Sequence, residues 1–224
     1  MKKVALITGA SKGIGFALTK KLLQENFFVI GTSRSGNIEG VEDENFYALQ
    51  LDISNTESIK SAHEEIFSNF KRIDLLINNA GIGPDLGMQT PEKESFNQTF
   101  DVNVTGLVFF TEPLIELVNE NGIILNVSSK MGSLAVCEST DSIAYRMSKS
   151  ALNMYTKILS NRLKNNIRVA TIHPGWVQTT IIESNLENAR LTPKESADNM
   201  FDFLTSEFES GAFWDSETGT DLLW

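Results

Sequence analysis

The chain has 224 residues, of which 41% are hydrophobic and 21% are charged, and this length and composition are typical of one globular domain rather than of a fibre, a repeat array or a disordered tail. Its 19 basic and 29 acidic side chains give a formal net charge of −10, which repels phosphate backbones and argues against nucleic-acid binding. No stretch approaches the roughly 18 consecutive apolar residues of a membrane span, so we expect no membrane partner.

The start of the chain does not have the pattern of an export signal. Two lysines lead into the short apolar run Val4–Ile7, which is too short for the apolar region of a signal peptide and is typical of a strand. The single cysteine, Cys137, has no partner for an internal disulfide, which fits a reducing compartment, and we expect a cytoplasmic protein. His63 and His173 are far apart and lack cysteine partners, so we expect no metal site.

Short apolar runs rich in β-branched residues alternate with longer segments of helical period, which is typical of β-α-β units and a parallel sheet. The predicted strands are Val4–Ile7, Phe28–Gly31, Phe46–Leu51, Ile73–Ile77, Gly122–Val127 and Ile167–Ile172. The predicted helices lie at about 13–25, 55–69, 96–119, 142–165 and 193–208, with start signals at Asp52 to Asn55 and at Thr192-Pro193.

This order of elements predicts an α/β fold, a single domain over residues 1–224 with a doubly wound (Rossmann) parallel sheet flanked by helices on both faces. Right-handed crossovers place helices on both faces and bring the carboxyl ends of the strands to one edge, where ligands of such folds bind. The functional residues should therefore lie directly after strands.

A glycine-rich turn follows the first predicted strand. It reads Thr8-Gly9-Ala10-Ser11-Lys12-Gly13-Ile14-Gly15. Glycines let the backbone turn sharply and approach a pyrophosphate, whose charge the free N–H groups and the dipole at a helix start stabilise. Such a turn also occurs in ordinary loops, but the strand before it and the helix after it favour a dinucleotide site.

Further motifs follow in order along the chain. They are Asn78-Asn79-Ala80-Gly81 after the fourth strand, Asn103 within Asp101-Val102-Asn103-Val104, Ser129 with Gly132 after the fifth strand, Tyr145-x-x-x-Lys149, and Pro174-Gly175-Trp176-Val177-x-Thr179. Together with the glycine turn they resemble the motifs of the short-chain dehydrogenase/reductase family over nearly the whole chain. The segment Ala144–Asn153 and the ending from Gly211 to Trp224 look like the C-factor and Sniffer-like carbonyl reductase branch of that family. The resemblance implies an enzyme that transfers hydride between a nicotinamide cofactor and a carbonyl or alcohol carbon.

The end of the second predicted strand bears on the choice of cofactor. An acidic residue there would accept hydrogen bonds from the adenine ribose and repel a phosphate, whereas a guanidinium would pair with that phosphate. Residues 31–34 contain no acid and end in Arg34. Lys12 resembles a basic residue that family members with an NADP(H) preference use against the same 2′-phosphate. Each cation alone is as readily a solvated surface residue, but the two together favour NADP(H) over NAD(H).

The resemblance also implies positions along the rest of the cofactor. Asp52 and Ile53 are expected at the adenine, although Asp52 also suits a helix start, and Asn78 is expected to stabilise the strand end rather than to touch a ligand. The expected cofactor-binding residues are Gly9, Ser11, Lys12, Gly13, Ile14, Gly15, Arg34, Asp52, Ile53, Asn79, Ala80, Gly81, Tyr145, Lys149, Pro174, Gly175, Val177 and Thr179.

Tyr145 and Lys149 are four residues apart on a predicted helix, so they share one face about one turn apart. With an ordinary pKa of about 10 a tyrosine is a poor base near neutrality, but in the reduction direction its phenol is a general acid. By resemblance Tyr145 transfers the proton, Lys149 supplies positive charge, Ser129 binds the substrate oxygen and Asn103 supports a water-mediated proton path. For Asn103 a structural contact to the backbone remains equally open.

Three serines compete for the role at the substrate oxygen: Ser128, Ser129 and Ser133. We choose Ser129 because Ser129-x-x-Gly132 matches the family pattern. The interval from Ser129 to Tyr145 is a few residues longer than is usual in the family, and the extra length falls in Val136–Asp141. That loop must bulge away if the two hydroxyl groups are to meet.

The expected partner is a small carbonyl (aldehyde or ketone) or alcohol substrate, bound under a short loop at about 178–191. Met131, Trp176 and Ile181 either line an apolar pocket there or pack in the core. A homodimer or homotetramer remains open. The alternative function is a cofactor-binding signalling or regulatory protein of the same fold with incidental catalysis. A serine hydrolase is disfavoured because the chain has no G-x-S-x-G turn.

Overall fold

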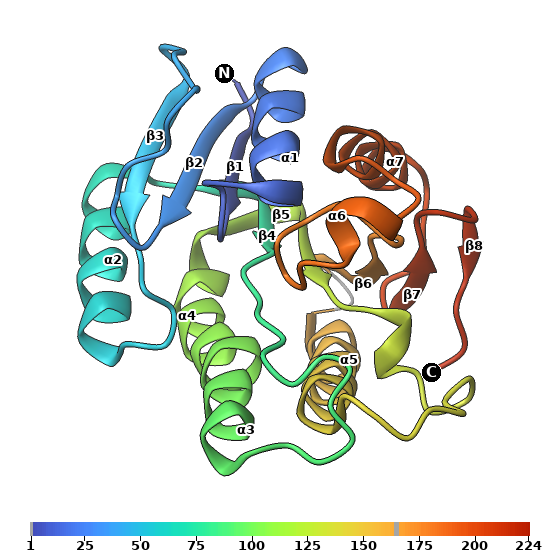
Figure 1. The fold of residues 1–224 in the computed structure, drawn as a ribbon. Helices are drawn as coiled ribbons and strands as arrows, with labels where there is room; N and C mark the ends of the chain where they lie inside the picture. The colour runs from blue at the N-terminus through green and yellow to red at the C-terminus, as the bar shows by residue number, and fades with distance from the viewer. Residues whose placement is uncertain (1, 164–165) are drawn as a thin grey trace.

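The computed structural model describes residues 2–163 and 166–224. Within them an eight-stranded sheet has the order β3-β2-β1-β4-β5-β6-β7-β8 (Figure 1). All neighbouring pairs are parallel except β7 and β8, which are antiparallel. The strands are β1 Val4–Ile7, β2 Phe28–Ser33, β3 Phe46–Gln50, β4 Ile73–Asn78, β5 Val118–Val127, β6 Arg168–His173, β7 Ala212–Asp215 and β8 Thr220–Asp221.

The strand order reverses next to β1, which pairs with β2 on one side and with β4 on the other. The chain therefore builds outward to β3, returns to the middle of the sheet and builds outward again in the opposite direction. Such a reversal leaves a crevice at the carboxyl ends of the two central strands, because their connections leave in opposite directions. The loops that follow β1 and β4 both begin at this crevice.

Helices cover both faces of the sheet, as predicted (Figure 1). On one face the buried side chains of α2, α4 and α5 pack with Leu6, Leu76 and Ile124. On the other face α1 and α7 pack with Ile7, Ile77 and other strand residues. The helices are α1 Gly13–Gln24, α2 Thr56–Asn69, α3 Lys93–Phe100, α4 Leu107–Leu114, α5 Ile143–Leu163, α6 Asn185–Asn188 and α7 Pro193–Thr205, with a π-helical turn at Asp101–Gly106 and 3-10 turns at Ile115–Leu117 and Lys130–Gly132.

Two helix starts follow the signals in the sequence. The side chain of Asn55 accepts a hydrogen bond from the N–H of Ser58 at 2.9 Å and caps α2. Thr192 and Glu195 form a reciprocal capping box around Pro193 at the start of α7. Because these caps satisfy N–H groups that a helix start leaves free, they fix where both helices begin.

The prediction of one continuous helix at 96–119 is wrong, because the segment is divided into several elements and a strand begins before position 119. It consists of α3, the π-helical turn, α4 and a 3-10 turn, and β5 begins at Val118. The helix widens where Gly106 passes the backbone of Ile53 so closely that a Cβ on Gly106 would overlap the Ile53 carbonyl. Strand β5 starts before position 122 because Val118 pairs with Ile73 across an irregular register. The residues that follow Val118 are polar, so the sequence gives no sign of this pairing.

The other differences concern the end of the chain and the helix ends. β7 and β8 were not predicted because runs of four and two residues are too short to show a period. Helix α7 ends at Thr205 rather than at 208. The predicted α5 helix reaches 165, and residues 164–165 lie outside the described residues.

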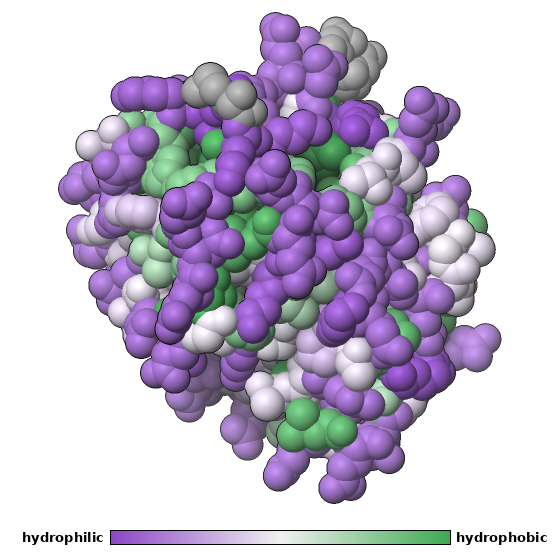
Figure 2. Space-filling view, turned by 90° about the horizontal axis from the view of Figure 1, so that it is seen from above, coloured by the Kyte–Doolittle hydropathy of each residue, from purple (hydrophilic) through white to green (hydrophobic). Residues whose placement is uncertain are grey.

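The surface near the amino ends of the strands is mostly hydrophilic, as the view from above in Figure 2 shows. Among the described residues, we find no helix with the length and apolar character that crossing a membrane requires.

Candidate active site

The glycine turn lies between β1 and α1 with the backbone conformation that its residues favour. Gly9 and Gly13 have φ angles of +70° and +58°, which glycine adopts without the steric cost that a side chain brings. A Cβ on Gly15 would lie 2.3 Å from the Gly9 carbonyl oxygen, so only glycine fits there. Lys12 at the N-cap of α1 has no side-chain acceptor. The first N–H groups of the helix are therefore available to an anion.

Asn79 ties the end of β4 to this turn. Its Nδ2 donates to the carbonyl oxygens of Thr8 and Gly9 at 2.9 and 3.2 Å. The hydroxyl of Thr8 accepts from the N–H groups of Asn79 and Ala80, both at 3.0 Å. The link joins the two strands that flank the crevice. Thr8 was not singled out in the sequence, because threonine at a strand end is common and its partners are 71 and 72 residues away.

A cavity of about 730 Å³ lies at the crevice. The residues predicted for the cofactor that line it are Gly9, Ser11, Lys12, Gly13, Ile14, Gly15, Arg34, Asp52, Ile53, Asn79, Ala80, Gly81 and Thr179. Most of the predicted set therefore lies around one cavity. The lining residues that were not predicted for the cofactor are Thr32, Ser33, Leu51, Ser54, Ile82, Gly83, Pro84, Gln98, Asp101, Val102, Thr180 and Ile181. Their neighbours in sequence were predicted, so most could have been found by extending each motif by a few residues.

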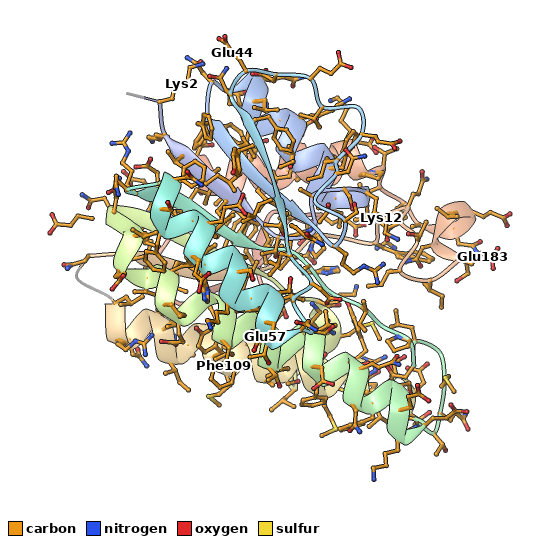
Figure 3. The ribbon with its side chains drawn as sticks, turned by 90° about the vertical axis from the view of Figure 1, so that its left-hand side faces the viewer. Lys2, Lys12, Glu44, Glu57, Phe109 and Glu183 are labelled. Carbon is orange, nitrogen blue, oxygen red and sulfur yellow. The ribbon has the colours of Figure 1, made fainter. Side chains whose placement is uncertain are left out.

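Two cations flank this cavity. Arg34 follows β2 and is exposed, and Lys12 donates from Nζ to the hydroxyl of Thr180 at 3.0 Å. Figure 3 places Lys12 on the side of the molecule that carries Glu183 of the 178–191 loop. The two cations therefore border one cavity from different elements.

Tyr145 and Lys149 lie on one face of α5 and are both buried, with 8% and 4% of their surfaces exposed. The Lys149 Nζ lies 5.5 Å from the centre of the Tyr145 ring and donates to the Val127 carbonyl at 2.9 Å. Burial raises the pKa of Tyr145 to about 12 and lowers the pKa of Lys149 to about 8. Near neutral pH the phenol therefore carries its proton and is suited to donate it.

Of the three serines, Ser129 is the one whose side chain affects the pKa of the phenol. A hydrogen bond with its side chain acts against burial and lowers the pKa of Tyr145. The Ser128 hydroxyl instead donates to Asn153 at 2.7 Å, and the Ser133 hydroxyl donates to the Leu223 carbonyl at 2.6 Å. Residues 136–140 are exposed, so the added length lies at the surface.

Asn103 comes from the π-helical turn and is fully buried. Its Oδ1 accepts from the N–H of Ile82 at 2.9 Å, and its Nδ2 donates to the carbonyl of Ile82 at 2.8 Å. Its Nδ2 also lies 3.1 Å from the hydroxyl of Ser148. A Cβ on Gly81 would lie 3.4 Å from both Asn103 Oδ1 and Lys149 Nζ. The amide thus has the structural contact that the sequence left open, and it has this contact next to the lysine amine.

Five residues predicted for the cofactor do not line the cavity: Tyr145, Lys149, Pro174, Gly175 and Val177. The last three anchor the loop that follows β6. The Pro174 carbonyl accepts from the hydroxyl of Ser196 at 2.7 Å, and Gly175 has a φ of +88°. Val177 pairs with Leu191 as an isolated bridge. The loop at 178–191 therefore leaves and rejoins the domain at one point.

Further contacts hold this loop from outside. The indole Nε1 of Trp176 donates to Asn185 in α6 at 2.9 Å, and Arg190 forms an ion pair with Glu217 at 2.5 Å. Trp176 itself is 41% exposed. The Arg190 guanidinium lies over its ring, 5.5 Å from the ring centre.

Asp85, in the loop after β4, is a residue that the sequence reasoning missed. It is fully buried and accepts hydrogen bonds from the backbone N–H groups of Ala144 and Tyr145 at 2.7 and 3.1 Å. Its charge also raises the pKa of Tyr145. No local pattern signals this contact, because the two segments are 59 and 60 residues apart in the sequence.

His173 is packed at the end of β6, and Asn78 donates to Thr111 and Asn126 inside the fold. Both positions agree with the structural roles predicted for them. In residues 2–163 and 166–224 there is no group of three or more His, Cys, Asp or Glu side chains that could hold a metal ion.

Comparison with known proteins identifies relatives over most of the chain. The family model for short chain dehydrogenases matches residues 3–190. An uncharacterized oxidoreductase from Methylorubrum extorquens is 33% identical over 186 residues, which is 79% of this chain and 74% of that protein.

Solved structures are similar over the whole fold. The NADPH-bound carbonyl reductase from chicken fatty liver superposes with a TM-score of 0.88 at 26% identity and covers 100% of this chain and 94% of that one. The carbonyl reductase Sniffer of D. melanogaster has a TM-score of 0.86 at 26% identity, with 100% of each chain covered. A 3-ketoacyl-(acyl-carrier-protein) reductase from Brucella melitensis, solved with NADH, has a TM-score of 0.81 at 28% identity and covers 95% of this chain and 96% of that one. The similar structures therefore include both nicotinamide cofactors.

Proposed function

Because the chain belongs to the short-chain dehydrogenase/reductase family, we propose that this oxidoreductase is an NADP(H)-dependent carbonyl reductase that acts on small aldehydes or ketones and on the corresponding alcohols. The observation that carries the proposal is the burial of Tyr145 and Lys149 on one face of α5, beside Gly83 and Gly81 of the cavity wall. Ser129 lowers the pKa of Tyr145, and Lys12 and Arg34 border the same cavity.

The residues around the cavity fit a dinucleotide. Gly9 and Gly15 leave no room for side chains where the backbone has to pass close to a pyrophosphate, and the start of α1 offers its free N–H groups. When bound, the nicotinamide ring supplies or accepts the hydride. The protein binds and orients the two reactants and controls the proton.

In the reduction direction Tyr145 donates its phenolic proton to the substrate oxygen as negative charge develops there. The high pKa of the buried phenol keeps that proton available near neutral pH. Ser129 holds the same oxygen by a hydrogen bond and fixes its distance from the phenol. Lys149 lies beside the ring, where its positive charge stabilises the phenolate that remains after proton transfer.

The preference for NADP(H) rests on Lys12 and Arg34. Both cations border the cavity, and residues 31–34 contain no acidic side chain that would repel a phosphate. A phosphate between two cations gains charge-assisted hydrogen bonds that a ribose hydroxyl does not offer. The NADPH-bound carbonyl reductase among the similar structures supports the same choice.

The proposed substrate side lies under the loop at 178–191. Trp176 is partly exposed beside α6, and Ile181 lines the cavity. These apolar surfaces favour an aldehyde or ketone with a hydrophobic substituent, because burial of that group away from water contributes to binding.

The test is a parallel measurement of binding and turnover. NADPH and NADH are compared by thermal shift, and NADPH oxidation is then followed with a panel of aldehydes, ketones and quinones. We expect the larger shift with NADPH and turnover that is lost in Tyr145→Phe. Binding of NADPH with no panel member turned over above the Tyr145→Phe background would contradict the proposal, as would a larger shift with NADH.

A further inference from the structure

The first turn of α5, which carries Tyr145, lacks a cap from its own N-terminal residue. Ser142 precedes the helix with a φ of +57°, outside the extended region that an N-cap residue normally occupies. Its hydroxyl accepts from the N–H of Gly87 at 2.9 Å and lies 3.1 Å from the Asp141 carboxylate. The serine hydroxyl is therefore committed elsewhere, although a helix start needs acceptors for its free N–H groups.

Asp85 supplies these acceptors from another part of the chain. Its Oδ2 accepts from the N–H of Ala144 at 2.7 Å, and its Oδ1 and Oδ2 lie 3.1 and 3.3 Å from the N–H of Tyr145. The side chain is fully buried, where a carboxylate is costly unless hydrogen bonds compensate it. The helix dipole adds favourable interaction at this end of α5. Asp85 thus acts as the cap of α5, and one of its bonds ends on the backbone of Tyr145 itself.

The loop that carries Asp85 is held at both of its ends. Ile82 is bound through its N–H and its carbonyl by Asn103, and the Met88 carbonyl accepts from the N–H of Ser142 at 2.8 Å. Between them Gly83 packs against the phenol ring, because a Cβ there would lie 3.0 Å from the Tyr145 Cδ2. The loop therefore contacts Tyr145 on its ring and on its backbone, and it cannot shift without moving one of them.

We propose that Asp85 is a positioning residue for the proton transfer: it caps α5 from the loop after β4 and thereby holds Tyr145 in place. The kinetic part of this proposal rests on the proposed function, whereas the capping part stands on the hydrogen bonds alone.

Among the charged groups near Tyr145 in the described residues, Asp85 is the one that is both negatively charged and buried. From the same helix, Lys149 faces the ring at 5.5 Å, and Arg146 is paired with Asp141 at 3.1 Å toward the surface. Lys130, after β5, and Asp101, in the π-helical turn, are exposed, so solvent screens their charges. The negative charge of Asp85 raises the pKa of Tyr145. Its removal should therefore let the phenol lose its proton at lower pH.

The experiment compares wild type, Asp85→Asn, Asp85→Ala and the matched control Asp141→Asn, which removes one carboxylate at the same helix start but at the surface. Amide hydrogen exchange of residues 143–149 is measured in the unliganded protein, and NADPH affinity is measured by fluorescence. Alcohol oxidation with NADP⁺ is then followed as a function of pH.

We expect faster exchange at Ala144 and Tyr145 in both Asp85 variants, an NADPH affinity that changes by less than about twofold, and a kcat that falls by about tenfold, in line with the cost of a misplaced reacting group. In Asp85→Asn the rise of activity with pH should move to lower pH, which loss of structure alone would not cause. Asp141→Asn should leave all of these quantities unchanged.

Exchange rates equal to wild type in Asp85→Asn and Asp85→Ala would overturn the capping role. An unchanged kcat and pH profile in Asp85→Asn would overturn the effect on proton transfer. Because exchange needs neither cofactor nor substrate, it tests the capping role even if no carbonyl compound is turned over, and absence of turnover in wild type would count against the proposed function only. If Asp85→Ala does not fold, Asp85→Asn, which keeps one acceptor oxygen, still decides both points.

Discussion

The side-chain amide of Asn103 binds both polar backbone groups of Ile82, at 2.9 and 2.8 Å. This pair of hydrogen bonds copies the pairing between two strands, although Asn103 lies in a π-helical turn and Ile82 lies in a loop. It joins the turn that precedes α4 to the segment that lines the cavity, where Gly81 lies between Asn103 and the Lys149 amine.

Replacement of Asn103 by Ala should therefore weaken both the fold and the site. Two partly buried backbone groups of Ile82 lose their partner, and we expect a loss of about 1–2 kcal/mol in the free energy of unfolding together with reduced kcat. Urea denaturation and carbonyl reduction measure the two effects. Thr105→Ala, at an exposed position of the same turn, is the control and should change neither quantity appreciably.

Tyr145→Phe should abolish most of the activity while the fold stays intact. Loss of a general acid usually costs about 10²- to 10⁴-fold in rate, and the ring that packs under Gly83 is retained. The matched control is Tyr155→Phe on the same helix, whose hydroxyl donates to Glu112 at 2.9 Å outside the site. Steady-state rates of NADPH oxidation distinguish the two variants, and comparable rates in both would remove Tyr145 from the mechanism.

The pH dependence of reduction should reflect Lys149. Burial lowers its pKa to about 8, so the ammonium that stabilises the phenolate is present below that pH and is lost above it. We expect kcat/KM for carbonyl reduction to be level below about pH 8 and to fall above it. In Lys149→Met the rate should be low at every pH without this decline. A wild-type profile that stays level to about pH 10, near the ordinary lysine value, would show that burial does not act in this way.

Loss of the two cations at the cavity should change the choice of cofactor. We expect Lys12→Ala and Arg34→Ala each to weaken NADPH binding by about tenfold, or about 1.4 kcal/mol, and to leave NADH binding almost unchanged. Titration of protein fluorescence with each cofactor measures both affinities. Lys71→Ala, an exposed lysine after α2, controls for the change in net charge. Equal losses with NADPH and NADH would mean that the cations do not bind the 2′-phosphate.

Acid should destabilise the fold through His173. Burial lowers the pKa of His173, so below about pH 6.5 the unfolded chain takes up a proton that the folded chain does not. The free energy of unfolding should then fall with decreasing pH over this range, and more steeply in wild type than in His173→Gln. Urea denaturation between about pH 8 and about pH 5 measures the slopes, and equal slopes would contradict the prediction.

The sequence predicted those features that depend on neighbouring residues. The glycine turn, the strands before each motif and the caps at Asn55 and Thr192 all follow from short patterns. Ser129, the serine chosen among three, is the one whose side chain lowers the pKa of Tyr145.

The features that escaped prediction depend on contacts between distant segments. The cap that Asp85 places on α5 joins residues about 60 positions apart, and an aspartate in a polar loop has no local sign of burial. The close approach of Gly106 to the Ile53 backbone, at the end of the π-helical turn, is likewise a contact between distant segments that no local pattern indicates. β7 was too short to show a period, and its place at the edge of β6 came only from the packing of the whole sheet.

Val177 and Leu191 close the 178–191 loop at its base, so that the loop forms a separate region of the fold. The N–H of Gln178 donates to the Leu191 carbonyl at 2.9 Å, and the N–H of Leu191 donates to the Trp176 carbonyl at 3.0 Å. These two hydrogen bonds hold the two ends of the loop together. Changes within this segment should therefore leave the ends of the strands in place. Under the proposed function, transplanting the corresponding segment of a relative should change the range of substrates on the same scaffold.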